Sequence, residues 1–334
     1  MSLARIARIA FVAASYSLSG TPAMAELPDA ATLLADFGYT PADIAQVLNG
    51  KLVSGSIAAG SDRELVASMA FQVPVPPAQL VKELRAGLLV QVDPSVIAQA
   101  RQQGALGSAD FAKLTLGPDA AKQAQLWTSG DAGVLNRSSD EIAAFQKLGA
   151  GAAPATVEAQ LRATLFARAE SYRTGGLAGI APYVRAGGAP RSPADEIATA
   201  TAAIRGLAKY APAASQLLRS YPNSKPAGTE ESFGWTYFDA RGTPTIVLQH
   251  VLFVPNGDGW IVVQRQFYVS TGYNAEQAVA ALLPVATGTV VIYGNRTSTD
   301  QITGFGGSTK RSLGSKVLAS QLKAVFEKLR AKVK

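Results

Sequence analysis

The sequence predicts an α+β protein in which an antiparallel sheet packs on a long C-terminal helix, with a helical subdomain inserted partway along the chain. Three observations support this fold class. Strand-like apolar runs separated by short turn sequences fill residues 233–270. Residues 139–222 are rich in alanine and carry apolar residues at helical spacing. Residues 313–333 form a further apolar stripe at helical spacing, which predicts a helix covering the sheet.

The first residues have the three-part pattern of a secretory signal peptide. Arg5 and Arg8 precede an apolar stretch over residues 9–18, and Ala23-Met24-Ala25 supplies the small residues of a cleavage site. The stretch is too short to span a bilayer, and no later run reaches about 18 apolar residues. We expect cleavage near Ala25 to remove the signal peptide, 1–25, and to leave a soluble protein without a transmembrane segment that is periplasmic or secreted. A buried first helix is the alternative.

Residues 26–138 are expected to form the N-terminal α+β part of the sheet domain. Thr40-Pro41 predicts the start of a short helix that ends at Gly50. Strand-like segments at 51–57 and 64–73 predict a hairpin, and a helix follows over 78–87. After a short apolar run, the remainder of this part is rich in loop-forming residues.

Residues 139–222 are expected to form the helical insert. One helix opens at Ser139, and apolar residues from Val157 to Tyr172 predict a longer one that ends at Gly175-Gly176. A further helical stretch is expected over 179–188. Another begins at Ser192-Pro193 and continues toward Leu218, with an interruption at Pro212.

Residues 223–334 are expected to form an antiparallel sheet and the long final helix. Strands are predicted at 233–239, 245–254 and 260–270, with turns at Arg241-Gly242 and at 256–259. A helix near 275–283 and a strand at 289–295 come next. The apolar stripe of the final helix consists of Leu313, Val317, Leu322, Val325, Phe326, Leu329 and Val333.

Composition excludes several kinds of site. The chain has no cysteine, so disulfides, thiolate metal sites and cysteine nucleophiles are absent. It has a single histidine, no recognisable metal-ligand spacing and no nucleotide or dinucleotide fingerprint, so we predict no metal and no cofactor. Serine-hydrolase and zinc-protease motifs are likewise missing.

The formal net charge is +7, and much of the excess lies near the C-terminus. The basic residues there are Lys310, Arg311, Lys316, Lys323, Lys328, Arg330, Lys332 and Lys334, and Glu327 is the acidic residue among them. Two interpretations stay open, a solvated helix face or weak attraction to an anionic membrane surface. An exported chain is not expected to bind nucleic acid.

The glycine-rich segment at 304–307 joins the last strand to the basic helix, and its nearby lysine raises the question of a phosphate loop. Lys310 follows Thr309 rather than glycine, so the segment does not match that motif. We predict a tight turn, with Ser308 or Thr309 capping the final helix. A weaker anion site at this helix end, assisted by Arg311 or Arg296, is the functional alternative.

A small set of residues carries the candidate chemistry. His250 shares a strand face with apolar residues, which is typical of a core histidine, while ligand contact and a catalytic base are the alternatives. Arg265 and Arg296 lie inside strands, so each needs a salt-bridge partner or an acidic ligand group. The ligand-binding candidates are Trp235, His250, Arg265, Tyr268, Tyr293, Arg296 and Arg311.

The order of elements resembles the helix-grip arrangement of START-like lipid-binding proteins, which implies a cavity between a curved sheet and the last helix. Separately, "ESFGWTYFDARGTPTIVLQHVLFVP", "VVQRQFYVSTGY" and "VVIYGNRTSTDQITGFGG" resemble segments of a group of uncharacterised secreted bacterial proteins. Where that group has a Cys-x-x-Gly-Asp-Cys element, this chain keeps Gly130-Asp131 without either cysteine. This second resemblance implies export and a common architecture, and it implies no activity.

Three functions follow as hypotheses. The first is an exported protein that binds or carries an apolar or amphipathic small molecule or lipid in a cavity between sheet and helix. The second is an enzyme that uses His250 with Arg296 or Asp300 as acid-base and anion-stabilising groups. The third is a structural or protein-interaction role in the cell envelope, which an exposed apolar patch on the helical insert would favour. The oligomeric state does not follow from the sequence.

Overall fold

The computed structural model describes residues 28–333, apart from residues 94, 188, 205 and 240–243. The predicted signal peptide and the predicted turn at Arg241-Gly242 lie outside the described residues.

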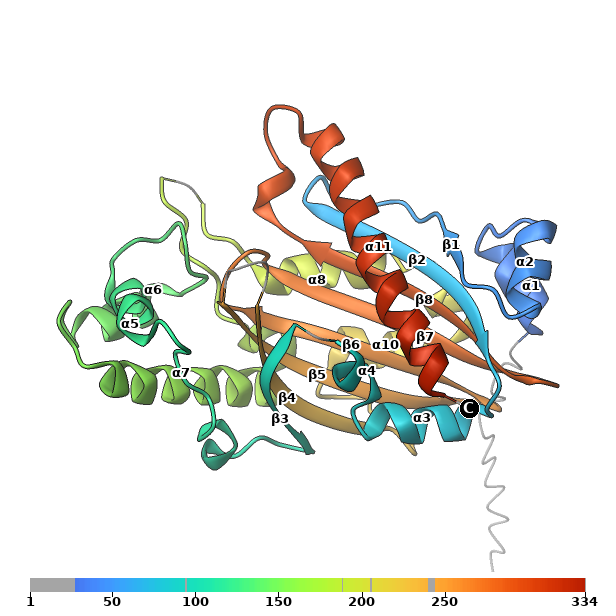
Figure 1. Cartoon of the computed structure of the whole chain (residues 1–334), viewed down its shortest axis with the longest axis horizontal. Helices are drawn as coiled ribbons and strands as arrows, with labels where there is room; N and C mark the ends of the chain where they lie inside the picture. The colour runs from blue at the N-terminus through green and yellow to red at the C-terminus, as the bar shows by residue number, and fades with distance from the viewer. Residues whose placement is uncertain (1–27, 94, 188, 205, 240–243, 334) are drawn as a thin grey trace, which may run out of the picture.

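An antiparallel sheet forms the centre of the molecule, as predicted (Figure 1). Its strands within the described residues are β1 Val53–Gly55, β2 Glu64–Val73, β3 Val96–Gln103, β4 Glu230–Asp239, β5 Pro244–Asn256, β6 Gly259–Val269, β7 Ala275–Val285 and β8 Gly288–Ser298. Their order in the sheet is β1-β2-β8-β7-β6-β5-β4-β3. Strands β4 to β8 are therefore a meander of sequence neighbours, and β2 from the N-terminal part pairs with β8 near the C-terminus.

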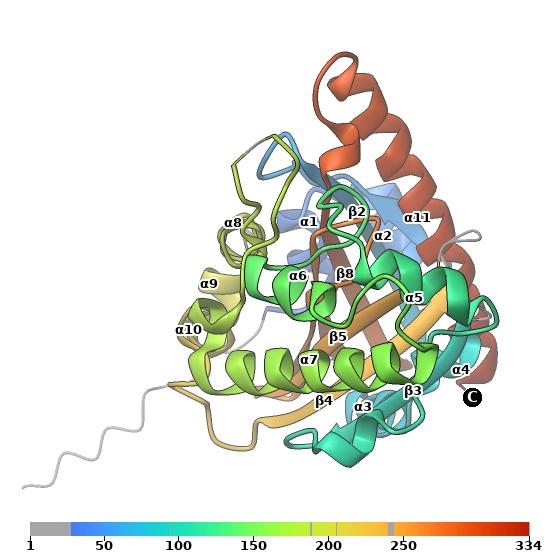
Figure 2. The same ribbon diagram turned by 90° about the vertical axis from the view of Figure 1, so that its left-hand side faces the viewer.

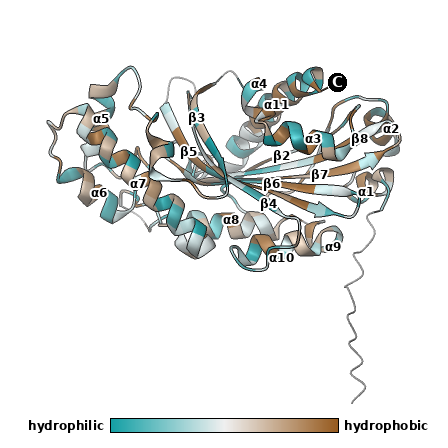
Figure 3. Ribbon diagram, turned by 90° about the horizontal axis from the view of Figure 1, so that it is seen from below, coloured by the Kyte–Doolittle hydropathy of each residue, from teal (hydrophilic) through white to brown (hydrophobic). Residues whose placement is uncertain are grey.

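Helices cover both faces of this sheet. They are α1 Ala30–Asp36, α2 Pro41–Leu48, α3 Pro77–Arg85, α4 Leu88–Val92, α5 Ala120–Thr128, α6 Ser139–Gln146, α7 Pro154–Gly175, α8 Pro193–Ala202, α9 Leu207–Tyr210, α10 Pro212–Ser220 and α11 Gly307–Lys332, with short 3₁₀ turns η1 Ser108–Phe111, η2 Gly176–Gly179 and η3 Asp300–Ile302. Figure 3 shows α3, α4 and α11 on one face and α8, α9 and α10 on the other. Figure 2 shows the same separation from the end of the sheet, with α7 also lying away from α11.

Local signals explain where several helices begin. Thr40 accepts a hydrogen bond from the backbone of Asp43, and Asp43 bonds back to the Thr40 N–H, so α2 starts with a capping box before Pro41. Ser138 and Glu141 form the same arrangement at the start of α6. The predicted hairpin is also present as β1 and β2, and the predicted strands over 233–270 are β4, β5 and β6.

Two predicted helices are wrong. The segment near 275–283 is strand β7, which lies between β6 and β8 and pairs with both. Its alanines favour a helix locally, but pairing on both edges and helices over both faces give small side chains a place in a buried strand. In the segment 179–188, Gly179 ends the 3₁₀ turn η2 and the other described residues are not helical, and Tyr183 pairs in an isolated bridge with Arg191. Two further elements, β3 and α5, fall in the stretch that was expected to be loops.

The final helix contacts β2 near its start, where Ser315 accepts a hydrogen bond from the Val66 N–H at 3.1 Å, but it buries large apolar side chains only near its C-terminal end. Phe326 and Leu329 are buried against Phe71 and its neighbours, whereas Leu313 and Val317 of the same predicted stripe are exposed. Hence the long C-terminal helix covers the sheet as predicted, but its first turns do not contribute to the core.

The glycine segment before α11 forms a turn, as predicted. Gly304 and Gly306 have φ values of +75° and +73°, which glycine adopts without the strain that a side chain causes. The predicted cap is wrong, because α11 begins at Gly307 and both Ser308 and Thr309 lie inside it, with no side-chain cap bond. No helix in the described part of the chain combines the length and apolar character that crossing a membrane requires.

Candidate binding site

A cavity of about 480 Å³ lies on the face of the sheet opposite α11. Its floor includes Ser68 of β2, Val279 and Ala281 of β7, and Ile292 and Gly294 of β8. Its walls come from α1, from residues 56–58 after β1, and from the segment between α8 and α10. The volume falls in the range of about 300–1,000 Å³ that is typical of small-molecule sites.

Small residues on the floor create this space. A Cβ atom added at Gly294 would meet only the Ile57 side chain, at 4.0 Å, so the volume above Gly294 is open. On the wall, by contrast, Phe37, which directly follows α1, lies so close to Gly206 that a Cβ added at Gly206 would approach the Phe37 ring to 2.3 Å. The apolar wall therefore closes tightly, while the floor leaves room for a ligand.

Two charged residues that line the cavity, Asp36 and Lys209, are exposed to solvent. Lys209 lies 2.9 Å from Asp36, and the Tyr210 hydroxyl donates to the same carboxylate. The hydrogen bond from Tyr210, and then Lys209, lower the pKa of Asp36. Asp36 and Lys209 are exposed and Tyr210 is half-buried, and together they link α1 to α9, so the site combines a largely apolar interior with a polar edge that faces solvent.

Arg296 borders the cavity and fastens its walls to the sheet. Its guanidinium lies 2.7 Å from Glu64 and donates to the carbonyls of Ala58, at 3.1 Å, and Ala203, at 3.0 Å. The structure thus confirms the prediction that Arg296 has a salt-bridge partner, which is Glu64. With its charge balanced by Glu64, this side chain holds the cavity in shape.

Arg296 belongs to a polar row that crosses the sheet. His250 pairs with Arg265, Arg265 with Gln277, and Gln277 with Arg296, so these four residues occupy the same level on β5, β6, β7 and β8. Residues paired across strands point to the same face, here the face covered by the helical insert. Strand spacing then puts His250 about 14 Å from Arg296 in Cα positions.

The catalytic grouping predicted from the sequence is therefore not formed. His250 is fully buried and three strands away from Arg296, and proton transfer needs contact near about 3 Å or one bridging water. Asp300 lies beyond the end of β8, four residues after Arg296, and so does not approach His250.

His250 instead joins a buried hydrogen-bond chain. Its Nε2 lies 3.1 Å from a Glu231 oxygen and its Nδ1 lies 3.1 Å from the Tyr172 hydroxyl. Because a carboxylate only accepts, Nε2 carries the proton and Nδ1 accepts from Tyr172. Burial lowers the pKa of His250 to about 4, against the opposing effect of Glu231. Burial raises the pKa of Glu231, but hydrogen bonds from His250 and Lys225 outweigh it and bring the pKa to about 2.

Arg265 is buried beside this chain and has neutral oxygen partners. It donates twice to the Gln277 amide oxygen, at 3.0 and 2.8 Å, to the Leu218 carbonyl at 3.0 Å and to the Tyr172 hydroxyl at 3.2 Å. None of these hydrogen-bond partners is a carboxylate, so the expectation of an acidic partner is wrong for this residue. Gln277 continues the network to Thr201 of α8 at 2.9 Å.

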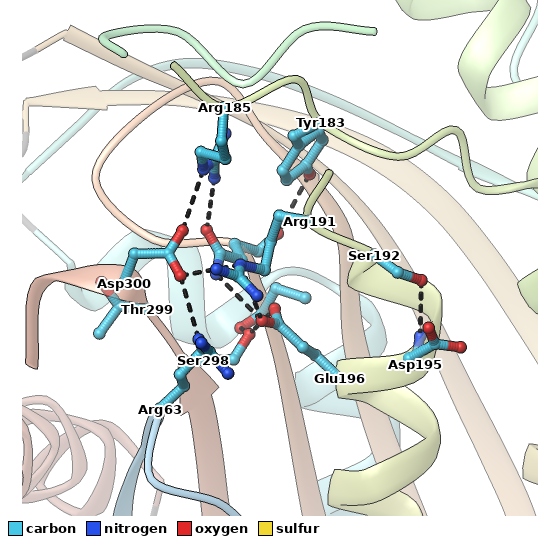
Figure 4. A network of polar contacts seen from close by, with 12 residues as sticks. Arg63, Tyr183, Arg185, Arg191, Ser192, Asp195, Glu196, Ser298, Thr299 and Asp300 are labelled. Atoms are coloured by element: carbon cyan, nitrogen blue, oxygen red, sulfur yellow. Dashed lines mark hydrogen bonds and ion pairs between the residues drawn. The ribbon is translucent and has the colours of Figure 1, made fainter. Parts of the chain in front are cut away.

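Asp300 lies at the centre of an arginine cluster (Figure 4). Arg63, Arg185 and Arg191 approach its carboxylate to 3.3, 3.0 and 2.8 Å. These arginines come from the β1–β2 connection and from the segment around Tyr183, so the cluster ties both to the end of β8. Because three arginines occupy this carboxylate, its contacts are those of a structural anchor and not those of the catalytic group predicted for it.

The remaining candidates are structural or lie elsewhere. The Trp235 indole donates to the Asp110 carbonyl, and the Tyr268 ring lies 4.3 Å from the Arg168 guanidinium. Tyr293 borders the cavity, but its ring packs on Phe326 on the opposite face.

Arg311 donates to the Asp62 carbonyl. Since Arg296 is also bonded elsewhere, the predicted anion site at the start of α11 is not formed by these two groups. Sequence reasoning missed Gly294, although a glycine inside a predicted strand is a known signal of close approach or open space.

The cavity implied by the helix-grip resemblance is nearly filled. Only about 50 Å³ remains between the sheet and α11, where Phe71, Tyr293 and Phe326 meet. The position of the cavity was therefore predicted on the wrong face of the sheet.

Within the described part of the chain, no three histidine, aspartate or glutamate side chains are placed to hold a metal ion. No protein-family model matches the sequence, and no curated protein or solved structure was found to be similar to it. Both resemblances noted from the sequence thus stay predictions.

Proposed function

We propose that this protein binds an apolar or amphipathic small molecule in the cavity between α1, α9 and the sheet. The observation that carries the proposal is a largely apolar cavity of about 480 Å³ in which Glu64 balances the charge of Arg296 and the Asp36–Lys209 pair is exposed to solvent. Leu33, Ile57 and Leu207 suit a hydrocarbon body, and Lys209 and Tyr210 suit a polar end group. The signal-like N-terminal pattern supports a place for this activity in the periplasm or outside the cell.

The enzyme hypothesis has no comparable support, because its three residues do not converge. The envelope hypothesis was tied to an exposed apolar patch on the helical insert. The large apolar side chains exposed in the described part are Leu48, Ile97, Val134, Phe305, Leu313 and Val317, and all lie outside 139–222.

The substitution Gly294→Val tests the proposal by filling the cavity from its floor. Gly294 has no positive φ and no close backbone neighbour, so the valine should fold without strain and occupy ligand space. Binding of the neutral probe N-phenyl-1-naphthylamine is measured by fluorescence titration, and molecules that co-purify are identified by native mass spectrometry. We expect the variant to lose affinity for the probe at least tenfold and to lose any co-purifying molecule.

Gly151→Val is the matched control, since a Cβ at Gly151 also meets open space but far along the chain from the cavity residues. It should bind the probe like the wild type, and both variants should keep the wild-type melting temperature. Equal probe binding by wild type and Gly294→Val, or no binding and no co-purifying molecule in the wild type, would contradict the proposed site.

A further inference from the structure

The first turns of α11 and the loop before them present apolar side chains to solvent. Phe305 is fully exposed (101%), Leu313 is 63% exposed and Val317 is 36% exposed. Figures 1 and 2 both show this end of α11 reaching beyond the edge of the sheet. The feature is unusual because the other end of the same helix buries Phe326 and Leu329 in the core.

Helical geometry places the exposed groups on one side. Lys310, Leu313 and Val317 are separated by three and four residues and so project from the same face, with Lys316 beside them. The turn at Gly304 and Gly306 positions Phe305 just before the helix. We call Phe305, Lys310, Leu313, Lys316 and Val317 the α11 docking face.

The charge along this segment of the chain has one sign. No aspartate or glutamate occurs between Gln301 and Phe326, while Lys310, Arg311, Lys316 and Lys323 lie in that interval. Arg311 is engaged with the Asp62 carbonyl, but Lys310 and Lys316 are exposed and make no ion pair with any described residue. Exposed apolar side chains beside unpaired lysines complement a partner that has a negatively charged surface with an apolar layer directly beneath it.

We propose that the α11 docking face binds reversibly to the surface of an anionic lipid bilayer. The apolar side chains would enter the headgroup region while the lysines meet the lipid phosphates, the arrangement by which amphipathic basic segments bind membranes. The absence of acidic residues from the face argues against self-association through it, since a second copy would bring lysines against lysines. This inference is independent of the cavity, which lies on the other side of the sheet.

Vesicle co-sedimentation tests the proposal with the chain from Glu26 to Lys334, which contains every described residue and lacks the predicted signal peptide. Vesicles of phosphatidylcholine alone are compared with vesicles containing phosphatidylglycerol, at low and at physiological salt. We expect binding to the anionic vesicles that weakens at least tenfold as salt rises, and little binding to the neutral ones.

Two double variants separate the contributions. Phe305→Ser with Leu313→Ser should lower the partition coefficient on anionic vesicles at least tenfold, and Lys310→Gln with Lys316→Gln should lower it and reduce its salt dependence. All four positions are exposed, so the melting temperature should not change. Ile97→Ser, at a 57% exposed apolar residue of β3, is the control and should bind like the wild type.

Absence of binding by the wild type to anionic vesicles at low salt overturns the proposal, as does wild-type binding by the Phe305/Leu313 variant. Self-association that this variant abolishes in analytical ultracentrifugation would assign the face to a second copy instead. Gly294→Val should bind vesicles normally, so a failure of the cavity proposal and a failure of this one give different results.

Discussion

The two faces of the sheet are built by different means. On the α11 side, aromatic and aliphatic side chains such as Phe71, Tyr293 and Phe326 pack together and leave about 50 Å³. On the opposite side, a buried polar row runs under the helical insert, and a cavity of about 480 Å³ lies next to it. The cavity therefore lies on the face of the sheet that is held to its helices by hydrogen bonds, and the face held by apolar packing has almost no cavity.

The difference follows from where the bonds are made. Arg265 donates to the Leu218 carbonyl in the last turn of α10, and Arg296 donates to the Ala203 carbonyl at the end of α8. The last carbonyls of a helix lack partners within the helix and lie at the negative end of its dipole. Two buried cations thus hold two helix ends at defined points, and close packing along the whole interface is not required.

The same device occurs at other helices. Arg101 donates to the Leu84 carbonyl at the end of α3, and Arg137 donates to the Trp127 carbonyl at the end of α5. Burial lowers the pKa of both Arg101 and Arg137, which remain cationic at any ordinary pH.

The largest effect is expected from Arg265→Met. The substitution leaves the Leu218 carbonyl and the Gln277 amide oxygen buried without their donor, so the free energy of unfolding should fall by about 3–5 kcal/mol. Urea denaturation measures it. Arg173→Met, which removes an exposed pair with Glu170, is the control and should cost less than about 1 kcal/mol. Similar losses for both variants would mean that the polar row does not hold the insert.

Phe326→Ala tests the apolar face. The side chain is buried between the rings of Phe71, at 5.1 Å, and Tyr293, at 4.7 Å between centroids. Removing it should lower the free energy of unfolding by about 3 kcal/mol through lost burial and a new cavity. Leu313→Ala, at an exposed position of the same helix, should change it by less than about 0.5 kcal/mol. A small effect at Phe326 would show that the α11 side is not closely packed.

A smaller, pH-dependent effect should distinguish the polar row from the apolar face. The pKa of His250 is about 4 in the folded protein and near 6.5 when unfolded, so the unfolded chain binds more protons in this interval. Stability should therefore decrease as pH falls through that window, by about 2 kcal/mol between pH 7 and pH 5. At lower pH, Glu231 adds a further loss of stability, because its pKa is about 2 in the folded protein and 4.5 ordinarily. This loss develops as the pH falls from the ordinary pKa of a glutamate toward about 2.

The measurement is the free energy of unfolding against pH for wild type and His250→Gln. Because His250 is the only histidine and its bonded partner Glu231 titrates at lower pH, the difference between the two curves from pH 7 to pH 5 reports the titration of His250. Burial raises the pKa of Glu196 and Glu276, which acts in the opposite direction but is common to both proteins. Parallel curves for the two proteins would show that His250 is not held neutral in the fold.

Much of the fold could be predicted because its signals are local. The capping residues of α2 and the turn at 256–259 are each set within a few neighbouring positions, and the buried part of the α11 stripe follows from helical spacing. Strand β7 could not be predicted this way, since its alanine-rich sequence favours a helix and only pairing with β6 and β8 makes it a strand.

The site was harder to predict than the fold. The positions 250, 265, 277 and 296 have no regular spacing, and they align because turn lengths and a register shift between Leu248 and Gln249 set the pairing. The cavity depends on Phe37, Ile57 and Gly294, which are far apart in the chain and meet only in three dimensions. A sequence pattern could suggest a cavity, but it could not choose the face.

The pairing of β2 with β8 has a consequence for the order of assembly. Each of the strands β4 to β8 can pair with the strand before it as soon as it is synthesised. Strand β2, in contrast, keeps one ten-residue edge unpaired until β8 has been made, more than two hundred residues later. During that interval Met69, Phe71 and Val73 are exposed on a strand that is able to join any other open edge. The growing chain is therefore most prone to aggregation before β8 has been made. A chaperone that covers the hairpin of β1 and β2 would raise the yield of folded protein.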